Sequence, residues 1–251
     1  VLGQHDYSLN GTWQFKTDPN NIGEPEKWFQ SNNDLSGWEG LDVPGNWDLH
    51  NAYAHYVGKA WYVKTFSLPA DWEDKNLFIN FEGVYHDCTV WLNGIKLGEN
   101  NSGFLPFEFE VTDLLSFSQK NTLTVRVDNT FKRGAIWNWG GIRRPVQVTA
   151  FDDLRITRQH ITPILDVKKN EAEVAIRIFF ENFKDESMVA EGEVLLSASN
   201  GYKQVLPFST SVSANGKKDF VLTTRIKKKD VHLWHFDDPF LYESAIRFKT
   251  K

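Results

Sequence analysis

Hydrophobic and polar residues alternate with a period of two along much of the chain. Residues 107–111 (FEFEV), 123–127 (LTVRV) and 174–180 (VAIRIFF) place apolar side chains at every second position, the pattern of a strand with one buried face. Apolar spacing typical of a helix extends over no more than one turn, at the Pro-containing segment 24–29 (EPEKWF). The pattern predicts an all-β chain with one short helical turn at 24–29.

Asn-Gly pairs separate several of the apolar runs. Residues 93–94 lie between the runs 90–92 and 95–97, and Asn and Gly best tolerate the positive φ that both central residues of a type I′ turn require. We expect a β-hairpin there and turns of the same kind at 200–201 and 215–216. Many short strands separated by such turns favour β-sandwiches.

The distribution of tryptophan divides the chain near residues 151–154 (FDDL). Nine of the ten Trp residues precede this point, and about 100 residues with one Trp follow it. The second part has the length of an immunoglobulin-like sandwich, whereas the first suits a larger jelly roll. The sequence therefore predicts a jelly-roll β-sandwich at 1–151, resembling galactose-binding domains, and an immunoglobulin-like β-sandwich at 152–251.

Composition narrows the classes of ligand. Aromatic residues make up 14% of the chain, with ten Trp; Trp is common in sugar-binding proteins because pyranose rings stack on it, but it also fills sandwich cores. The net charge of −5 argues against nucleic acid as a partner. No apolar run reaches the length of a membrane span. Cys88 lies in an apolar run and is interpreted as a small buried hydrophobe.

Residue types that usually carry catalysis are not grouped in a recognisable motif. His232 and His235, followed by two aspartates at 237–238, come nearest to a metal set, but without a helix to align them a surface cluster is the better interpretation. His86 and Asp87 are neighbours on an expected strand, where adjacent side chains point to opposite faces, so we expect no hydrogen bond between them. The sequence predicts no catalytic residue, metal ligand or cofactor.

Two loops combine aromatic and polar residues in the way that binding sites do. They span residues 51–59 and 132–144, and the second holds Trp137, Asn138 and Trp139. Loops at the edge of a sandwich are common binding sites. Trp and Arg also anchor interfaces between domains, so composition leaves both interpretations open.

Seven motifs follow one another across essentially the whole chain: LNGTWQFKTDP (9–19), VPGNWD (43–48), AWYVKTFSLP (60–69), FEGVYHDCTVWLNGIKLGENNSGFLPFEFEVTDLL (81–115), NTLTVRVDN (121–129), WGGIRRPVQV (139–148) and LWHFDDPFLYE (233–243). Their order and spacing resemble the N-terminal part of glycoside hydrolase family 2 enzymes, which include β-galactosidases, β-glucuronidases and β-mannosidases. The resemblance implies a sugar-binding jelly roll followed by an immunoglobulin-like domain.

The resemblance also implies where catalysis resides. In this family a following (β/α)₈ barrel supplies the two glutamates of a retaining mechanism. The chain would then be the non-catalytic N-terminal part of a retaining exo-β-glycosidase, β-galactosidase-like and inactive alone. Its expected partners are its own C-terminal barrel and a β-glycoside substrate, and the longer protein could form a homo-oligomer.

Loops of the first domain reach the active site in β-galactosidases of this family, and they correspond to residues 53–59 and 132–138 here. Ala135 and Ile136 stand where some of those enzymes carry an acidic residue, which departs from a sodium-assisted, lactase-like site. Residues 140–146 correspond to a mostly structural segment. The resemblance thus implies substrate contact by five residues: Tyr56, Lys59, Trp137, Asn138 and Trp139.

Two other functions remain open at this point. The chain could be a free-standing carbohydrate-binding module or lectin, or a structural scaffold that mediates subunit contacts. For a bacterial enzyme that degrades polysaccharides, we expect a periplasmic or secreted location, with the cytoplasm as the alternative.

Overall fold

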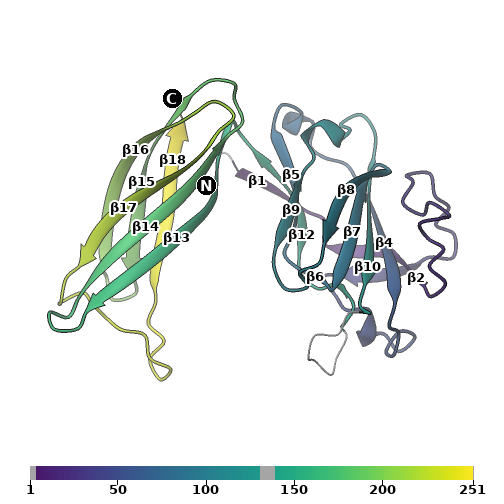
Figure 1. The fold of residues 1–251 in the computed structure, drawn as a ribbon, viewed down its shortest axis with the longest axis horizontal. Coiled ribbons are helices and arrows are strands. Elements are labelled where there is room, and N and C mark those ends of the chain that lie inside the picture. The colour runs from purple at the N-terminus through teal and green to yellow at the C-terminus, as the bar shows by residue number, and fades with distance from the viewer. Residues whose placement is uncertain (1–3, 131–138, 251) are drawn as a thin grey trace. The chain divides into compact units, whose positions relative to one another are not determined.

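The computed structural model describes residues 4–130 and 139–250 (Figure 1). The chain separates into two compact units, one spanning His5–Ala150 and the other beginning at Phe151. Within the described residues all regular elements are strands apart from three short 3₁₀ helices, and no helix there is long and apolar enough to cross a membrane. The predicted all-β fold class is confirmed.

The first unit is a sandwich of two antiparallel sheets. One has the strand order β1-β12-β5-β9, the other the order β3-β2-β4-β10-β7-β8, and β6 and β11 form a small separate ladder. A single core contains side chains from both large sheets, which is the arrangement of a jelly roll. The strands are β1 (Gln4–Ser8), β2 (Gly11–Asp18), β3 (Glu39–Val43), β4 (Lys59–Phe66), β5 (Asn76–Phe81), β6 (Val84–Tyr85), β7 (Asp87–Leu92), β8 (Ile95–Asn100), β9 (Phe107–Glu110), β10 (Asn121–Asp128), β11 (Gly141–Ile142) and β12 (Val146–Phe151), and the 3₁₀ helices are η1 (Trp47–Leu49), η2 (Ala70–Trp72) and η3 (Thr112–Leu114).

A second apolar cluster covers the outer face of the six-stranded sheet. Trp28 and Trp38, from the segment between β2 and β3, pack on Trp61 of β4 and Trp91 of β7. Trp61 also donates a 3.0 Å hydrogen bond from Nε1 to a buried Asp18 carboxylate. Residues 123–127 in β10 are therefore covered on both faces. The prediction that only one face of this strand is buried is wrong.

Segment 24–29 forms hydrogen-bonded turns instead of the predicted helical turn. Lys27 has a φ of +57°, which a right-handed helix does not allow. The Trp28 N–H consequently reaches back to the Gly23 carbonyl at 2.8 Å. This path carries Trp28 onto the sheet.

The second unit has two three-stranded antiparallel sheets, β13-β14-β17 and β16-β15-β18. Every second residue of β14 is buried between them, from Val174 to Phe180, as the alternating pattern predicts. The strands are β13 (Leu154–Asp166), β14 (Glu171–Asn182), β15 (Met188–Ala198), β16 (Lys203–Val212), β17 (Lys217–Ile226) and β18 (Tyr242–Thr250).

The three Asn-Gly pairs form three different connections. Asn93 and Gly94 have φ of +52° and +81° and join β7 to β8, which confirms the type I′ hairpin. At 200–201 only the glycine has positive φ, in a longer loop between paired β15 and β16. At 215–216 only the asparagine does, and the chain passes from β16 to β17 in the other sheet. The prediction of equivalent turns is wrong at these two positions, because tertiary connections and not the dipeptide set their geometry.

Candidate functional site

The ends of five strands bring the described parts of the two candidate loops, residues 51–59 and 139–144, to one rim of the first unit. Asp128 at the end of β10 pairs with Lys59 at the start of β4 on one side and with Asp87 at the start of β7 on the other. Gly141 of β11 pairs with Tyr85 of β6, next to β7. Of the predicted substrate contacts, Tyr56, Lys59 and Trp139 are described by the structure, whereas Trp137 and Asn138 lie outside the described residues.

The Tyr56 hydroxyl is already engaged within the protein. It accepts a hydrogen bond from the Asp18 backbone N–H at 3.2 Å and donates one to the Lys59 carbonyl at 2.5 Å. Its ring packs against Trp47 with centroids 5.9 Å apart, and burial raises the pKa of the hydroxyl. Substrate contact by Tyr56 stays a prediction, and the contacts that are present shape the loop.

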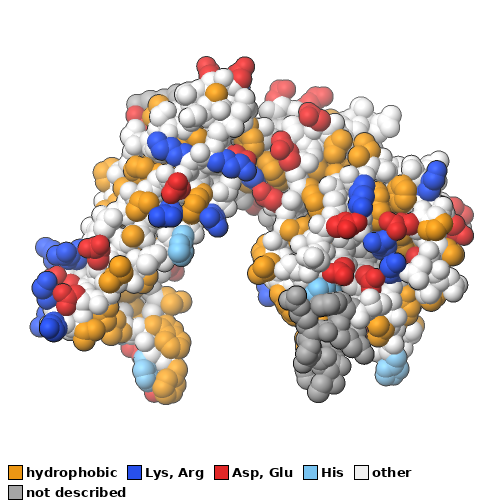
Figure 2. Space-filling model, in the orientation of Figure 1, with side chains coloured by type: hydrophobic (Ala, Val, Ile, Leu, Met, Phe, Trp, Pro, Cys, Tyr) orange, Lys and Arg blue, Asp and Glu red, His pale blue; other side chains and the backbone are white. Residues whose placement is uncertain are grey.

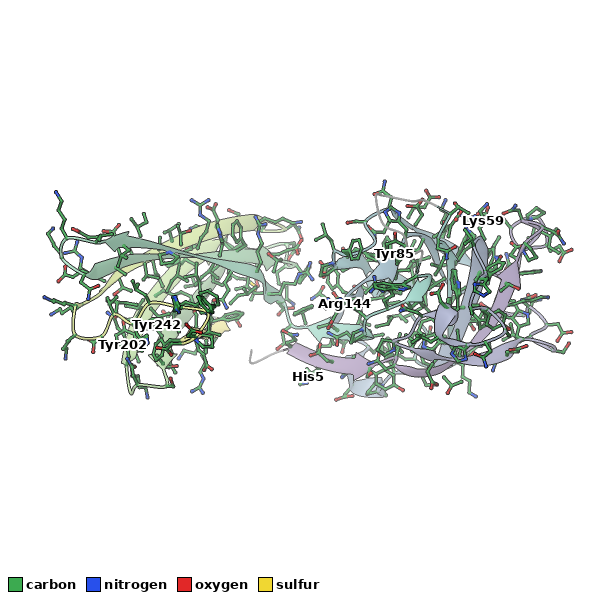
Figure 3. All side chains as sticks on the ribbon, turned by 90° about the horizontal axis from the view of Figure 1, so that it is seen from below. His5, Lys59, Tyr85, Arg144, Tyr202 and Tyr242 are labelled. Carbon is green, nitrogen blue, oxygen red and sulfur yellow. The ribbon has the colours of Figure 1, made fainter. Side chains whose placement is uncertain are left out.

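Lys59 begins β4 and is half-buried. Its cross-strand neighbours are Asp18 on β2 and Asp128 on β10. Across the ranges 4–130 and 139–250, no hydrogen bond or ion pair of its ammonium group is found. Figure 3 shows Lys59 at a distance from Tyr85 and Arg144 on the same unit. Its role as a substrate contact also stays a prediction.

Trp139 is held at the rim by the residue that follows it. The Gly140 N–H donates to Asp48 Oδ2 at 3.0 Å, and its carbonyl accepts from the Trp47 N–H at 3.0 Å. A Cβ on Gly140 would lie 1.9 Å from the fully buried Trp47 ring, so only glycine fits. The Trp139 side chain itself is 42% exposed, and its ring contacts the Arg143 guanidinium, with 5.0 Å from Cζ to the ring centroid.

The half-buried Asp48 and the fully buried Tyr62 place polar groups next to this segment. Burial raises the pKa of the Asp48 carboxyl, opposed by backbone N–H groups including that of Gly140 and by the Arg143 charge. Burial, and then the Asp48 charge, hold the pKa of Tyr62 well above its usual value. Among the described residues the Tyr62 hydroxyl and Asn46 Oδ1 have no hydrogen-bond partner. The rim therefore combines polar groups, those of Asp48, Tyr62 and Asn46, with the exposed aromatic ring of Trp139.

His86 and Asp87 are hydrogen-bonded, contrary to the expectation from strand alternation. His86 Nδ1 lies 2.8 Å from Asp87 Oδ1. His86 falls between β6 and β7 and outside both, so the rule that neighbouring side chains point to opposite faces does not apply to it. Its ring also packs on Tyr85, with centroids 5.3 Å apart.

Two histidines of the second unit, His232 and His235, lie in the loop between β17 and β18. His232 Nε2 is 2.6 Å from Asp238 Oδ2, and its ring stacks on Phe240 with centroids 4.1 Å apart. The His232 N–H donates to the Tyr242 hydroxyl, which lies beside Tyr202 (Figure 3). Within the part of the chain that the structure describes, no group of three or more His, Cys, Asp or Glu side chains could hold a metal ion. These pairs shape a loop whose tip is rich in hydrophobic side chains (Figure 2).

Two residues at the rim were not identified from the sequence. Asp48 is part of the VPGNWD motif, but it accepts a hydrogen bond from Gly140, 92 positions later. Nothing in the sequence around Asp48 indicates such a distant partner. Arg143 belongs to the segment interpreted as structural, and its aromatic surroundings come from three separate stretches of chain.

Comparison with known proteins agrees with this architecture. Residues 7–150 match the family model described as "Glycosyl hydrolases family 2, sugar binding domain", and residues 154–251 match that described as "Glycosyl hydrolases family 2". A β-galactosidase of Thermoanaerobacterium thermosulfurigenes is 27% identical over 96% of this chain and 34% of its own length. A β-glucuronidase of Formosa agariphila is 28% identical over 98% of this chain and 28% of its own.

Solved structures show the same fold. The Bacteroides uniformis β-glucuronidase has a TM-score of 0.85 at 24% identity, covering 99% of this chain and 30% of its own. A putative β-galactosidase from Bacteroides fragilis has a TM-score of 0.80 at 26% identity, over 98% of this chain and 39% of its own. The chain spans about a third of the length of the curated relatives that it matches. With family models matching both of its units, the chain belongs to glycoside hydrolase family 2.

Proposed function

We propose that the chain is the non-catalytic N-terminal part of a retaining exo-β-glycosidase that acts on β-galactosides. In this proposal a (β/α)₈ barrel elsewhere in the longer protein carries the two catalytic carboxylates, and the first unit completes the substrate pocket. The names of the relatives, β-galactosidase and β-glucuronidase, support a β-linked terminal sugar.

The observation that carries the proposal is the half-exposed Trp139 ring on a rigid base. The Gly140 hydrogen bonds to Asp48 and Trp47 fix the backbone next to it. A flat, fixed aromatic face offers a stacking surface at little cost in conformational entropy. We expect this ring to contact the sugar or the aglycone at the edge of the pocket.

The test compares the 251-residue chain with the longer protein on aryl β-galactoside, β-glucuronide and β-mannoside substrates. We expect the longer protein to hydrolyse the galactoside fastest and the 251-residue chain to hydrolyse none. In the longer protein, Trp139→Ala should raise KM about tenfold, the cost of one lost stacking contact of ~1.4 kcal/mol.

Ile95→Ala is the matched control, because Ile95 is an exposed apolar residue of the same unit next to the far end of β7. Its KM should equal that of the unchanged protein. Hydrolysis by the 251-residue chain alone would contradict the proposal. Sugar binding by a longer protein that hydrolyses nothing would instead favour a carbohydrate-binding module.

A further inference from the structure

Side chains link the two sheets of the second unit along the side formed by β16 and β17. Gln204 Nε2 on β16 donates to Thr224 Oγ1 on β17 at 2.7 Å. The rings of Phe208 and Phe220 also pack across this side, with centroids 5.9 Å apart. Figure 1 shows β13 and β18 along the opposite side of the same unit. The side of β16 and β17 is therefore closed by the unit's own side chains.

An apolar trough lies between β13 and β18 on the opposite side. Its volume is about 460 Å³. Near it, a hydrogen bond of 3.1 Å from Ser244 Oγ to Gln159 Oε1 joins the two strands. The apolar side chains that line the trough include Ile161, Pro163, Leu165, Val174, Leu196 and Ile226. The core of the second unit is thus open to solvent along this side.

Two side chains beside the trough point inward without being buried. Ile161 on β13 pairs with the fully buried Ile176, and directly paired residues share a face of the sheet. Ile161 is nevertheless 38% exposed. Ile246 on β18 pairs in the same way with the fully buried Val194 and is itself only partly buried. Both residues belong to a core that lacks a cover on this side.

β18 has a long free edge beside the trough. Among the described residues it pairs with β15 alone, over nine residues and without a register shift. Natural edge strands are often interrupted by proline or a bulge, which prevents further pairing. β13 has Pro163 and a register shift near Ile156, and β16 has Pro207, whereas β18 (YESAIRFKT) has neither feature. The backbone groups on its free edge are therefore open to another strand.

An added strand would pair with this edge and fill the trough at the same time. Residues 154–250 form six strands, whereas a constant-type immunoglobulin sandwich has seven. A small apolar ligand could fill the trough but would leave the β18 backbone groups without partners. An extended segment with apolar residues at every second position does both, as in the recognition of peptides by β-augmentation.

We propose that an extended segment of the longer protein, outside residues 1–251, pairs with the free edge of β18 and covers the trough as a seventh strand. All neighbouring strands in this unit are antiparallel, and the added strand is antiparallel as well. The chain covers 34% and 28% of two relatives, so proteins of this kind contain ample further chain to supply it. The inference rests on the proposed function only in taking the chain to be part of a longer protein.

Hydrogen–deuterium exchange followed by mass spectrometry tests this pairing. The exchange of residues 242–250 is compared between the 251-residue chain and the longer protein. We expect the amides on the free edge of β18 to exchange at least about tenfold more slowly in the longer protein, because they become hydrogen-bonded. β16 flanks β15 on its other side and is the internal control, with equal rates expected in both proteins.

Ile161→Asp places a charge at the trough. In the 251-residue chain the carboxylate stays in contact with water, whereas the added strand would bury it at a high cost in free energy. We expect the variant to return β18 exchange in the longer protein to the rate of the 251-residue chain. Val221→Asp is the matched control and should leave the exchange unchanged, since Val221 is 45% exposed and pairs with the exposed Arg177. Circular dichroism checks that each variant is folded.

Equal exchange of β18 in the two proteins would overturn the proposal. Slower exchange of β16 and β18 alike would also overturn it, because it would indicate a general gain in stability. So would slow exchange of β18 in the 251-residue chain that depends on protein concentration, since a second copy would then occupy the edge. Failure of the longer protein to hydrolyse any aryl glycoside would count against the proposed function and leave the exchange result standing.

Discussion

Gly140 packs directly against the Trp47 ring, and replacing the glycine tests this contact. Because a Cβ on Gly140 would lie 1.9 Å from the Trp47 ring, Gly140→Ala should lower the free energy of unfolding by about 2–3 kcal/mol. Urea unfolding followed by Trp fluorescence measures this. Gly201→Ala, with open space around it and a φ of +87°, should cost only about 1 kcal/mol of backbone strain.

Asp48 gives a pH-dependent prediction. Its pKa is raised in the folded state by burial, so folding favours the protonated form, and this contribution is lost as pH rises through the folded-state pKa. Asp48→Asn keeps an acceptor for the Gly140 N–H without the partly buried charge. We expect the variant to be more stable than the unchanged chain at pH 7, with the difference vanishing near pH 3. A difference that is constant across this range would show that the carboxyl is not perturbed.

The sequence could indicate that tryptophan mattered but not which role each one has. Trp47 and Trp61 are fully buried, while Trp139 is 42% exposed. All three lie in strand-like or loop sequences of similar composition, and the difference comes from partners distant in the chain. Tyr56 illustrates the same limit, because its hydroxyl bonds to Asp18, 38 positions away, cannot be inferred from its neighbours.

At the scale of elements, the β7–β8 hairpin depends on Asn93 beyond the turn itself. Asn93 accepts a hydrogen bond from the Thr122 N–H and donates to the Leu114 carbonyl and Asn121 Oδ1. Asn93→Ala should therefore cost about 2–3 kcal/mol, from lost hydrogen bonds and strain at positive φ. Thermal unfolding of the variant measures this loss. The control Asn200→Ala should cost less than about 1 kcal/mol, since it removes one exposed hydrogen bond.

The pairing of β13 with β14 includes an ion pair that gives the second pH prediction. Glu181 forms two ion pairs: its Oε2 lies 2.7 Å from Arg155 Nη2, and its Oε1 lies 3.0 Å from Lys217 Nζ. Burial acts to raise its pKa, but the hydrogen bonds from Lys217 and Arg155 outweigh it and leave the pKa lowered. Stability from Glu181 is then present above its ordinary pKa and lost as pH falls through the folded-state value.

Glu181→Gln should destabilise the second unit by about 2–4 kcal/mol at pH 7, because it removes the carboxylate charge that faces the buried Arg155 guanidinium. The loss should disappear in acid, where the carboxyl of the unchanged chain is protonated. Denaturant titrations at several pH values measure it. Glu173→Gln is the matched control, with a half-exposed side chain and a partner 3.9 Å away, and should change little.

Alternation predicted elements well where one face of the strand meets solvent. Residues 107–111 and 174–180 follow it, and the Asn93–Gly94 turn has the geometry expected of that dipeptide. The pattern fails at 123–127, because a distant aromatic cluster covers the polar face. At 215–216 it fails because the chain crosses to the other sheet. The local sequence predicts that a strand forms, whereas segments distant in the chain determine what packs against its faces.

At the scale of the whole molecule, tryptophan exposure should be measurable in solution. Among the described residues, Trp139 and Trp234 are 42% and 60% exposed and the others are buried. Trp234→Phe should therefore lower the fraction of emission that acrylamide quenches. Trp38→Phe, which removes a residue that is 8% exposed, should leave that fraction unchanged or raise it slightly. If Trp38→Phe lowered the quenched fraction more than Trp234→Phe, this would contradict the burial of tryptophans in the two apolar clusters of the first unit.

β10 is an inner strand of the six-stranded sheet. It pairs on both edges, with β4 and β7, and both of its faces are covered. Its amide hydrogens can then exchange with deuterium only when the first unit opens as a whole, so Val125 should retain its proton longer than the edge strand β8. For the same reason no position from 123 to 127 is a neutral surface position, and variation along this family should be narrowest there, even where the residue is a threonine.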